Sequence, residues 1–141
     1  MPDNKSVSEY ANQRANDKLF GFKIRKKLFS GEDAFFKNRP EVTGMAAEDG
    51  KIILNPYSKL NPQQFNMVAM NEALRLKMRK DGFNPKFTIT DEQKKFFKGT
   101  EYQDKPDFIR KTILARIYSG DNSAKATEEQ RSVLKKYLGS R

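Results

Sequence analysis

Residues 61–82, NPQQFNMVAMNEALRLKMRKDG, carry the clearest secondary-structure signal in the chain and set its fold class. Asn61 suits a helix N-cap and Pro62 suits the first helical position. Gly82 suits the residue that follows a helix. The sequence therefore predicts a helix over residues 62–81.

This predicted helix is apolar on two sides. Five residues at helical spacing form the first stripe, namely Phe65, Val68, Ala69, Ala73 and Leu76. The second stripe, on the opposite side, consists of Met67, Met70, Leu74 and Met78. Such a helix either lies centrally in its fold or faces its own core on one side and a partner on the other. Because methionine adapts to partner surfaces, we predict that the second stripe binds a partner; plain core packing is the alternative.

The N-terminal 39 residues predict a separate, basic helical arm. Ser6-Val7-Ser8-Glu9 matches a capping box and predicts a helix from about residue 7. Apolar residues then follow at spacings that are mostly three or four, namely Tyr10, Ala11, Ala15 and Leu19. This helix ends near Gly21 or continues to Ser30-Gly31, where Gly31 would suit a left-handed cap. Residues 34–36 resemble a short apolar anchor.

The domain predicted for residues 40–141 begins with a β-hairpin. Asp49-Gly50 suits the positive φ angles of a tight turn and separates two short apolar stretches. Three further helices follow, over residues 91–98, 104–119 or 106–119, and 127–138. Thr90-x-x-Gln93 and Thr127-x-x-Gln130 are capping boxes for the first and last of these helices. The predicted fold is a small, mainly α domain of about five helices with one short β-hairpin.

The residue types that the chain lacks exclude several kinds of chemistry. The 141 residues include no His and no Cys, which removes the usual neutral-pH general base, the thiolate nucleophile and the commonest zinc ligands. No apolar stretch approaches the length of a membrane span. We therefore expect a non-enzymatic protein with no metal site, no cofactor and no membrane partner.

One segment resembles a metallopeptidase motif without its ligands. In residues 70–75, MNEALR, Glu72 matches the glutamate of H-E-x-x-H, whereas Asn71 and Arg75 stand at the two ligand positions. Arginine stays protonated and cannot coordinate zinc. Glu72, or the pair Asp104 and Asp107, is the remaining candidate for a carboxylate-based hydrolase, which we treat as the least favoured function.

Positive charge is spread along the chain, whose formal net charge is +10. The densest basic run includes Lys23, Arg25, Lys26 and Lys27. We predict that these four residues contact phosphates of a nucleic acid without sequence specificity. The alternative is the solvated side of an amphipathic helix. Lysines 94, 95 and 98 are explained by the favourable dipole at a helix C-terminus and are not assigned to a binding surface.

Two pairs of adjacent phenylalanines raise the same question as the methionine stripe. Phe35-Phe36 and Phe96-Phe97 cannot each point both rings into one narrow core stripe. One ring of each pair should therefore lie at the periphery or contact a partner. We include Phe35 and Phe36 among the predicted partner-binding residues.

Three segments carry a family resemblance: PEVTGMAAEDGKIILNPYSKLNPQQFNMVAMNEALRL (40–76), the polar-aromatic helix that follows, and ILARIYSGDNSAKATEEQ (113–130). Over about residues 40–135 the chain resembles small uncharacterised proteins of tailed bacteriophages, particularly marine ones. The resemblance implies association with a phage particle or its assembly, and it transfers no catalytic residue. We therefore expect a virion structural or assembly protein that docks onto larger phage subunits through the methionine stripe. The alternative is a basic protein that binds nucleic acid or acts in host takeover.

Overall fold

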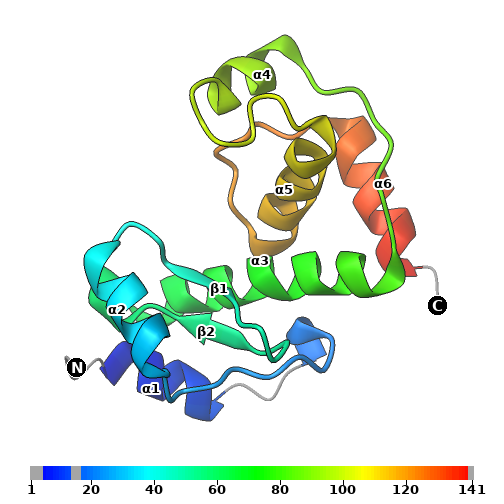
Figure 1. Ribbon diagram of the computed structural model, residues 1–141. Helices are drawn as coiled ribbons and strands as arrows, with labels where there is room; N and C mark the ends of the chain where they lie inside the picture. Colours follow the sequence, from blue (N-terminus) through cyan, green and yellow to red (C-terminus); the bar gives the residue numbers. More distant parts are fainter. Residues whose placement is uncertain (1–4, 14–16, 140–141) are drawn as a thin grey trace. The chain divides into compact units, whose positions relative to one another are not determined.

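The computed structural model describes residues 5–13 and 17–139 and divides the chain into two compact units (Figure 1). Unit 1 comprises residues 1–76 and unit 2 residues 77–141. The division falls within one long helix rather than near residue 39. The predicted N-terminal arm is thus part of unit 1.

Unit 1 contains two short helices and a small sheet in addition to most of the long helix. In chain order its elements are α1 (Lys5–Gln13), the 3-10 helix η1 (Asp17–Leu19), α2 (Ser30–Asn38), β1 (Gly44–Ala46), β2 (Ile52–Leu54), the 3-10 helix η2 (Pro56–Ser58) and α3 (Pro62–Asp81). The described helix α1 ends at Gln13, and Ala15 lies outside the described residues. Of the two alternatives for the first helix, the one in which it continues to Ser30-Gly31 is wrong, because residues 20–29 are not helical and a separate helix, α2, begins at Ser30.

The segment between η1 and α2 is extended instead of helical. Phe20 and Gly21 both have positive φ angles and turn the chain. Ile24 then forms a parallel bridge with Ile52. The backbone N–H of Arg25 donates to the carbonyl of Ile52 at 2.9 Å, and the N–H of Ile52 donates to the carbonyl of Lys23 at 2.8 Å. This segment therefore covers the edge of β2 that β1 leaves unpaired.

The predicted hairpin is present, with β1 antiparallel to β2 and Met45 opposite Ile53. Its turn closes with the N–H of Gly50 donating to the carbonyl of Ala47 at 3.0 Å. Gly50 has φ +78°, a conformation that glycine adopts without steric cost. The Asp49-Gly50 signal is thus explained by the glycine.

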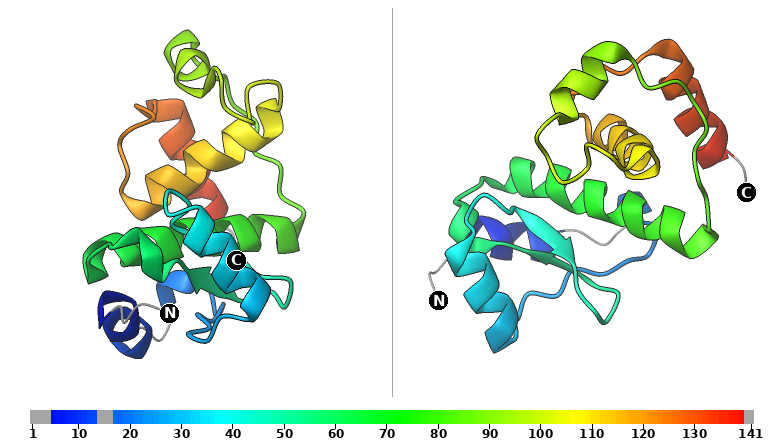
Figure 2. Two further views of the ribbon diagram at one scale, coloured as in Figure 1. Left: turned by 60° about the vertical axis from the view of Figure 1, so that its left-hand side comes forward. Right: turned by 45° about the horizontal axis from the view of Figure 1, so that its top comes forward.

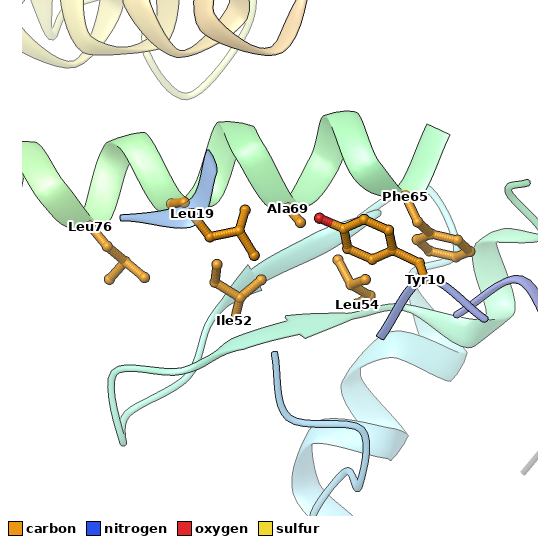
Figure 3. Packing of buried hydrophobic residues seen from close by; sticks show 8 residues of the cluster. Tyr10, Leu19, Ile52, Leu54, Phe65, Ala69 and Leu76 are labelled. Carbon is orange, nitrogen blue, oxygen red and sulfur yellow. The ribbon is translucent and has the colours of Figure 1, made fainter. Parts of the chain in front are cut away.

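Alternation along β2 gives unit 1 two hydrophobic clusters. Ile52 and Leu54 point toward α3 and join the larger cluster shown in Figure 3, which consists of Tyr10, Leu19, Ile52, Leu54, Phe65, Ala69, Ala73 and Leu76. Ile53 points to the opposite face and packs with Leu28, Phe36 and Ala47. The first apolar stripe of α3 is therefore a core-facing surface.

Unit 2 contains three further helices, which match the predicted ones closely: α4 (Asp91–Phe97), α5 (Pro106–Ser119) and α6 (Glu128–Gly139). Helix α5 packs against α6 (Figure 2). Along α5, Ile109, Thr112 and Ile113 are buried, but Phe108 is half exposed. Leu114 and Ala115 are buried in addition, so α5 is covered on more than one side.

Two buried glutamines join the starts of α4 and α6. Both predicted capping boxes form, since Gln93 N–H donates to Thr90 Oγ1 at 3.0 Å and Gln130 N–H donates to Thr127 Oγ1 at 3.2 Å. The Gln93 Nε2 donates to Gln130 Oε1 at 2.7 Å, and the Gln130 Nε2 donates back to Gln93 Oε1 at 2.8 Å. Each cap thus also fixes the position of the other helix.

Among residues 5–13 and 17–139, no helix combines the length and apolar character that crossing a bilayer requires.

Candidate functional site

The basic run that was predicted to contact phosphates is engaged within unit 1 at its arginine. Arg25 Nη1 and Nη2 bind the two carboxylate oxygens of Glu32 at 2.9 and 2.8 Å, and Nε binds Asp49 Oδ2 at 2.9 Å. The guanidinium also lies 4.0 Å from the centre of the Phe29 ring. Arg25 is therefore a structural cation, and the prediction that it contacts a phosphate is not supported by its geometry.

Electrostatics agree with this structural role. The pKa of Glu32 is lowered, mainly by its hydrogen bonds with Arg25. The pKa of Asp49 is lowered first by the backbone N–H of Lys51 and then by Arg25. The other three residues of the run, Lys23, Lys26 and Lys27, are exposed.

A pocket of about 640 Å³ lies beside this cluster, between Phe29 and Met45. Its polar lining includes Arg25, Glu32 and Asp49, which already bind one another. Of the four charged residues that line the pocket, three are therefore bound within the cluster, and Glu48 is the fourth.

The methionine stripe is not an open face. Leu74 and Met78 have no exposed surface, and Met70 packs against the larger cluster of unit 1. Met67 is partly buried. Leu74 and Met78 therefore lack the exposure that the predicted docking surface would require.

The phenylalanine pairs divide as expected, with one buried ring in each. Phe36 is fully buried whereas Phe35 is partly exposed, and Phe97 is buried whereas Phe96 is 44% exposed. Phe36 belongs to the smaller cluster of unit 1 and is therefore not a partner-binding residue.

The metallopeptidase-like positions of α3 bond each other instead of offering ligands. Arg75 Nε donates to Asn71 Oδ1 at 3.1 Å. Burial raises the pKa of the Glu72 carboxyl, while the charge of Arg75 acts in the opposite direction. In the part of the chain that the structure describes, no group of three or more acidic side chains could hold a metal ion.

Unit 2 exposes two aromatic rings beside cations, a feature that the sequence analysis did not assign to a site. The first is Phe96 on α4, which meets the buried ring of Phe97 edge to face with their centres 5.1 Å apart. The Arg116 guanidinium of α5 lies 5.1 Å from the centre of Phe96. Arg116 also forms an ion pair with Asp121, at 3.8 Å.

The second exposed ring is Phe108 at the start of α5, which is 50% exposed. It stacks on Tyr102 with the ring centres 6.2 Å apart, and Lys105 Nζ lies 5.7 Å from its centre. Figure 1 shows that a loop connects α4 to α5. We call residues 94–116 the aromatic–cationic segment.

The loop inside this segment is held by its own hydrogen bonds. The N–H of Gly99 donates to Gln103 Oε1 at 2.7 Å, and Thr100 Oγ1 donates to the carbonyl of Phe97 at 2.6 Å. The buried Gln93–Gln130 pair anchors the start of α4. The rings are therefore presented by an ordered backbone.

Unit 2 also has an excess of positive charge. Residues 77–141 include 16 Lys and Arg against 9 Asp and Glu. Lys94, Lys95 and Lys98 are exposed, and within the described residues no carboxylate forms an ion pair with them. In the sequence, this surface is indicated by the pattern KKFFK at residues 94–98. The helix dipole explains its lysines equally well, so the pattern alone does not predict a binding surface.

No protein-family model, curated protein or solved structure matches the chain. The function is therefore argued from the residues of the two units.

Proposed function

We propose that this protein is a non-enzymatic binding protein whose unit 2 attaches to the phosphate backbone of a nucleic acid. The observation that carries the proposal is the excess of positive charge in unit 2, together with exposed lysines that have no carboxylate partner among the described residues. Lysines of this kind release condensed counterions when they neutralise phosphates, which drives binding without sequence specificity. The partly neutralised basic run of unit 1 is less suited to this role.

A pair of matched triple variants tests the location of the surface. Each variant removes three positive charges. The unit 2 variant combines Lys94→Ser, Lys95→Ser and Lys98→Ser, and the unit 1 variant combines Lys23→Ser, Lys26→Ser and Lys27→Ser. Binding to a labelled 20-base-pair duplex is measured by fluorescence anisotropy between 50 and 300 mM salt.

The unit 2 variant should lose about ten- to a hundredfold in affinity and about 2–3 in the slope of log affinity against log salt. The unit 1 variant should lose much less. The opposite order would move the surface to residues 23–27. If the unmodified protein binds no nucleic acid, the proposal is refuted.

The phage resemblance supplies the setting of this proposal: a component of a tailed-phage particle or of its assembly, in contact with packaged or replicating nucleic acid. Mass spectrometry of purified virions tests it. A protein that is absent from the particles would refute a place in the virion, while nucleic-acid binding would then belong to the infected cell.

A further inference from the structure

Two aromatic rings of unit 2 are exposed beside cations. Attraction to phosphates alone needs no aromatic surface, yet Phe96 and Phe108 are 44% and 50% exposed in a chain with few large apolar residues. Leaving a large ring in water forgoes the free energy that its burial would contribute. Both rings lie in the aromatic–cationic segment, which also contains the lysines assigned to phosphate contact, Lys94, Lys95 and Lys98.

We propose that Phe96 and Phe108 are stacking platforms for unpaired bases, so that unit 2 binds single-stranded nucleic acid in preference to duplex. This inference rests on the proposed function and names its substrate class. Proteins that bind single strands without sequence preference combine aromatic rings, on which bases stack, with cations that follow the backbone. Bases within a duplex already stack on one another and offer no face to such a ring.

Each platform has both parts of this arrangement. Phe96 lies beside Arg116, and Phe108 lies beside Lys105. A base on either ring would place its phosphate near a cation. Arginine also contributes its own cation–π attraction.

Neighbouring rings hold both platforms in position. Phe97, which is buried, supports Phe96 edge to face, and Tyr102 stacks on Phe108. A ring that is already ordered loses little conformational entropy when a base stacks on it.

Phe29 provides an internal contrast. It is the most exposed of the three exposed phenylalanines, at 55%. Its neighbouring cation, Arg25, is bound by two close carboxylates, Glu32 at 2.8 Å and Asp49 at 2.9 Å, which would repel a phosphate. Arg116 beside Phe96 has one carboxylate, Asp121, at the longer distance of 3.8 Å. We therefore expect Phe29 to make no contribution, and it serves as the control ring.

The experiment compares full-length protein binding to labelled dT20, to an abasic 20-mer and to a 20-base-pair duplex at one salt concentration. The abasic strand has phosphates and no bases, so it separates stacking from charge. The variants are Phe96→Leu and Phe108→Leu, with Phe29→Leu as the matched control. Phe96→Tyr and Phe108→Tyr keep an aromatic face. Far-UV circular dichroism verifies that each variant is folded.

The unmodified protein should bind dT20 more tightly than the duplex or the abasic strand. Each leucine variant in unit 2 should lose about 5- to 150-fold in dT20 affinity, with duplex binding and the salt slope unchanged. The tyrosine variants should retain binding, and Phe29→Leu should have no effect.

Equal affinity for dT20 and abasic strand, or unchanged dT20 binding in both leucine variants, would overturn the inference. If, in that case, the lysine variant of unit 2 still weakened binding to every probe, the proposed function would stand and only the stacking inference would fail. If the unmodified protein binds none of the three probes, both the proposed function and this inference are refuted.

Discussion

Replacing the buried Asn55 by aspartate should destabilise unit 1 strongly. Asn55 has no exposed surface, and its Nδ2 donates to the carbonyls of Val42, Arg39 and Phe36 at 2.7, 3.1 and 3.2 Å. Its Oδ1 accepts from the N–H of Tyr57 at 2.8 Å. One amide thus ties the C-terminal end of α2 and the chain entering β1 to the end of β2.

The substitution keeps the size of the side chain and turns its donor into an acceptor. An amide has two hydrogens, so two bonds to buried carbonyls are lost. At about 1–1.5 kcal/mol for each bond, with a further penalty for carbonyl oxygens that face a buried carboxylate, the loss should be at least about 3 kcal/mol at pH 7. This is a large share of the total stability of a small protein, about 5–15 kcal/mol.

The effect of Asn55→Asp should also depend on pH. Burial and the surrounding carbonyls would raise the pKa of the new carboxyl in the folded state above its unfolded value. A protonated carboxyl can donate one hydrogen bond. The destabilisation relative to the unmodified protein should therefore shrink as the pH falls from 7 to 5.

Urea denaturation followed by far-UV circular dichroism at pH 7 and pH 5 measures both effects. Hydrogen exchange of amides in residues 30–54 assigns the change to unit 1. The exposed Asn84 provides the control, since Asn84→Asp should change stability by less than about 0.5 kcal/mol. A loss below about 1 kcal/mol for Asn55→Asp at pH 7 would refute the role given to this amide.

Three further substitutions test other parts of the fold. Gly44→Ala should cost about 1–3 kcal/mol, because an added Cβ would lie 2.6 Å from Val68 Cγ1; denaturation of the double variant with Val68→Ala should show partial recovery, and its absence would contradict the clash. Gln93→Ala and Gln130→Ala should each lower the melting temperature, and a double-mutant cycle should give a coupling of about 0.5–3 kcal/mol; strictly additive losses would show that the two amides act independently. Glu72→Gln should raise the melting temperature at pH 7, since burial raises the pKa of this carboxyl above its ordinary 4.5 and makes its ionised form unfavourable in the fold. That gain should vanish below about pH 4, where the carboxyl is protonated in both states, and an equal gain at both pH values would count against the assignment.

Much of the helical architecture could be predicted because its signals are local. Pro62 and Gly82 mark the ends of α3, and Thr90 and Thr127 cap α4 and α6 through bonds that span three residues. Interactions of that range depend on adjacent sequence and little else. The turn at Gly50 belongs to the same class.

Helix α2 was not predicted, because its N-terminus lacks the local capping signal that marks α4 and α6. Its N-cap position is Phe29, which supplies no side-chain hydrogen bond. The capping contact comes from Glu32, which accepts from the N–H of Phe29 at 2.9 Å and also binds Arg25. The Ser30-Gly31 pair, which suits the end of a preceding helix, is instead the beginning of α2.

The amino-acid sequence by itself determined the helices α3, α4, α5 and α6, the place where the hairpin turns, and that one ring of each phenylalanine pair must leave the core stripe. Tertiary structure alone decided that residues 22–26 pair with β2, that Leu74 and Met78 are buried, and that Arg25 is bound by carboxylates while Phe96 and Phe108 face solvent. The physical reason is that helix signals act over three or four residues. Whether an apolar or charged side chain meets core, carboxylate or water depends on chain segments beyond that range, from seven residues away for Glu32 to 24 for Asp49 in the case of Arg25.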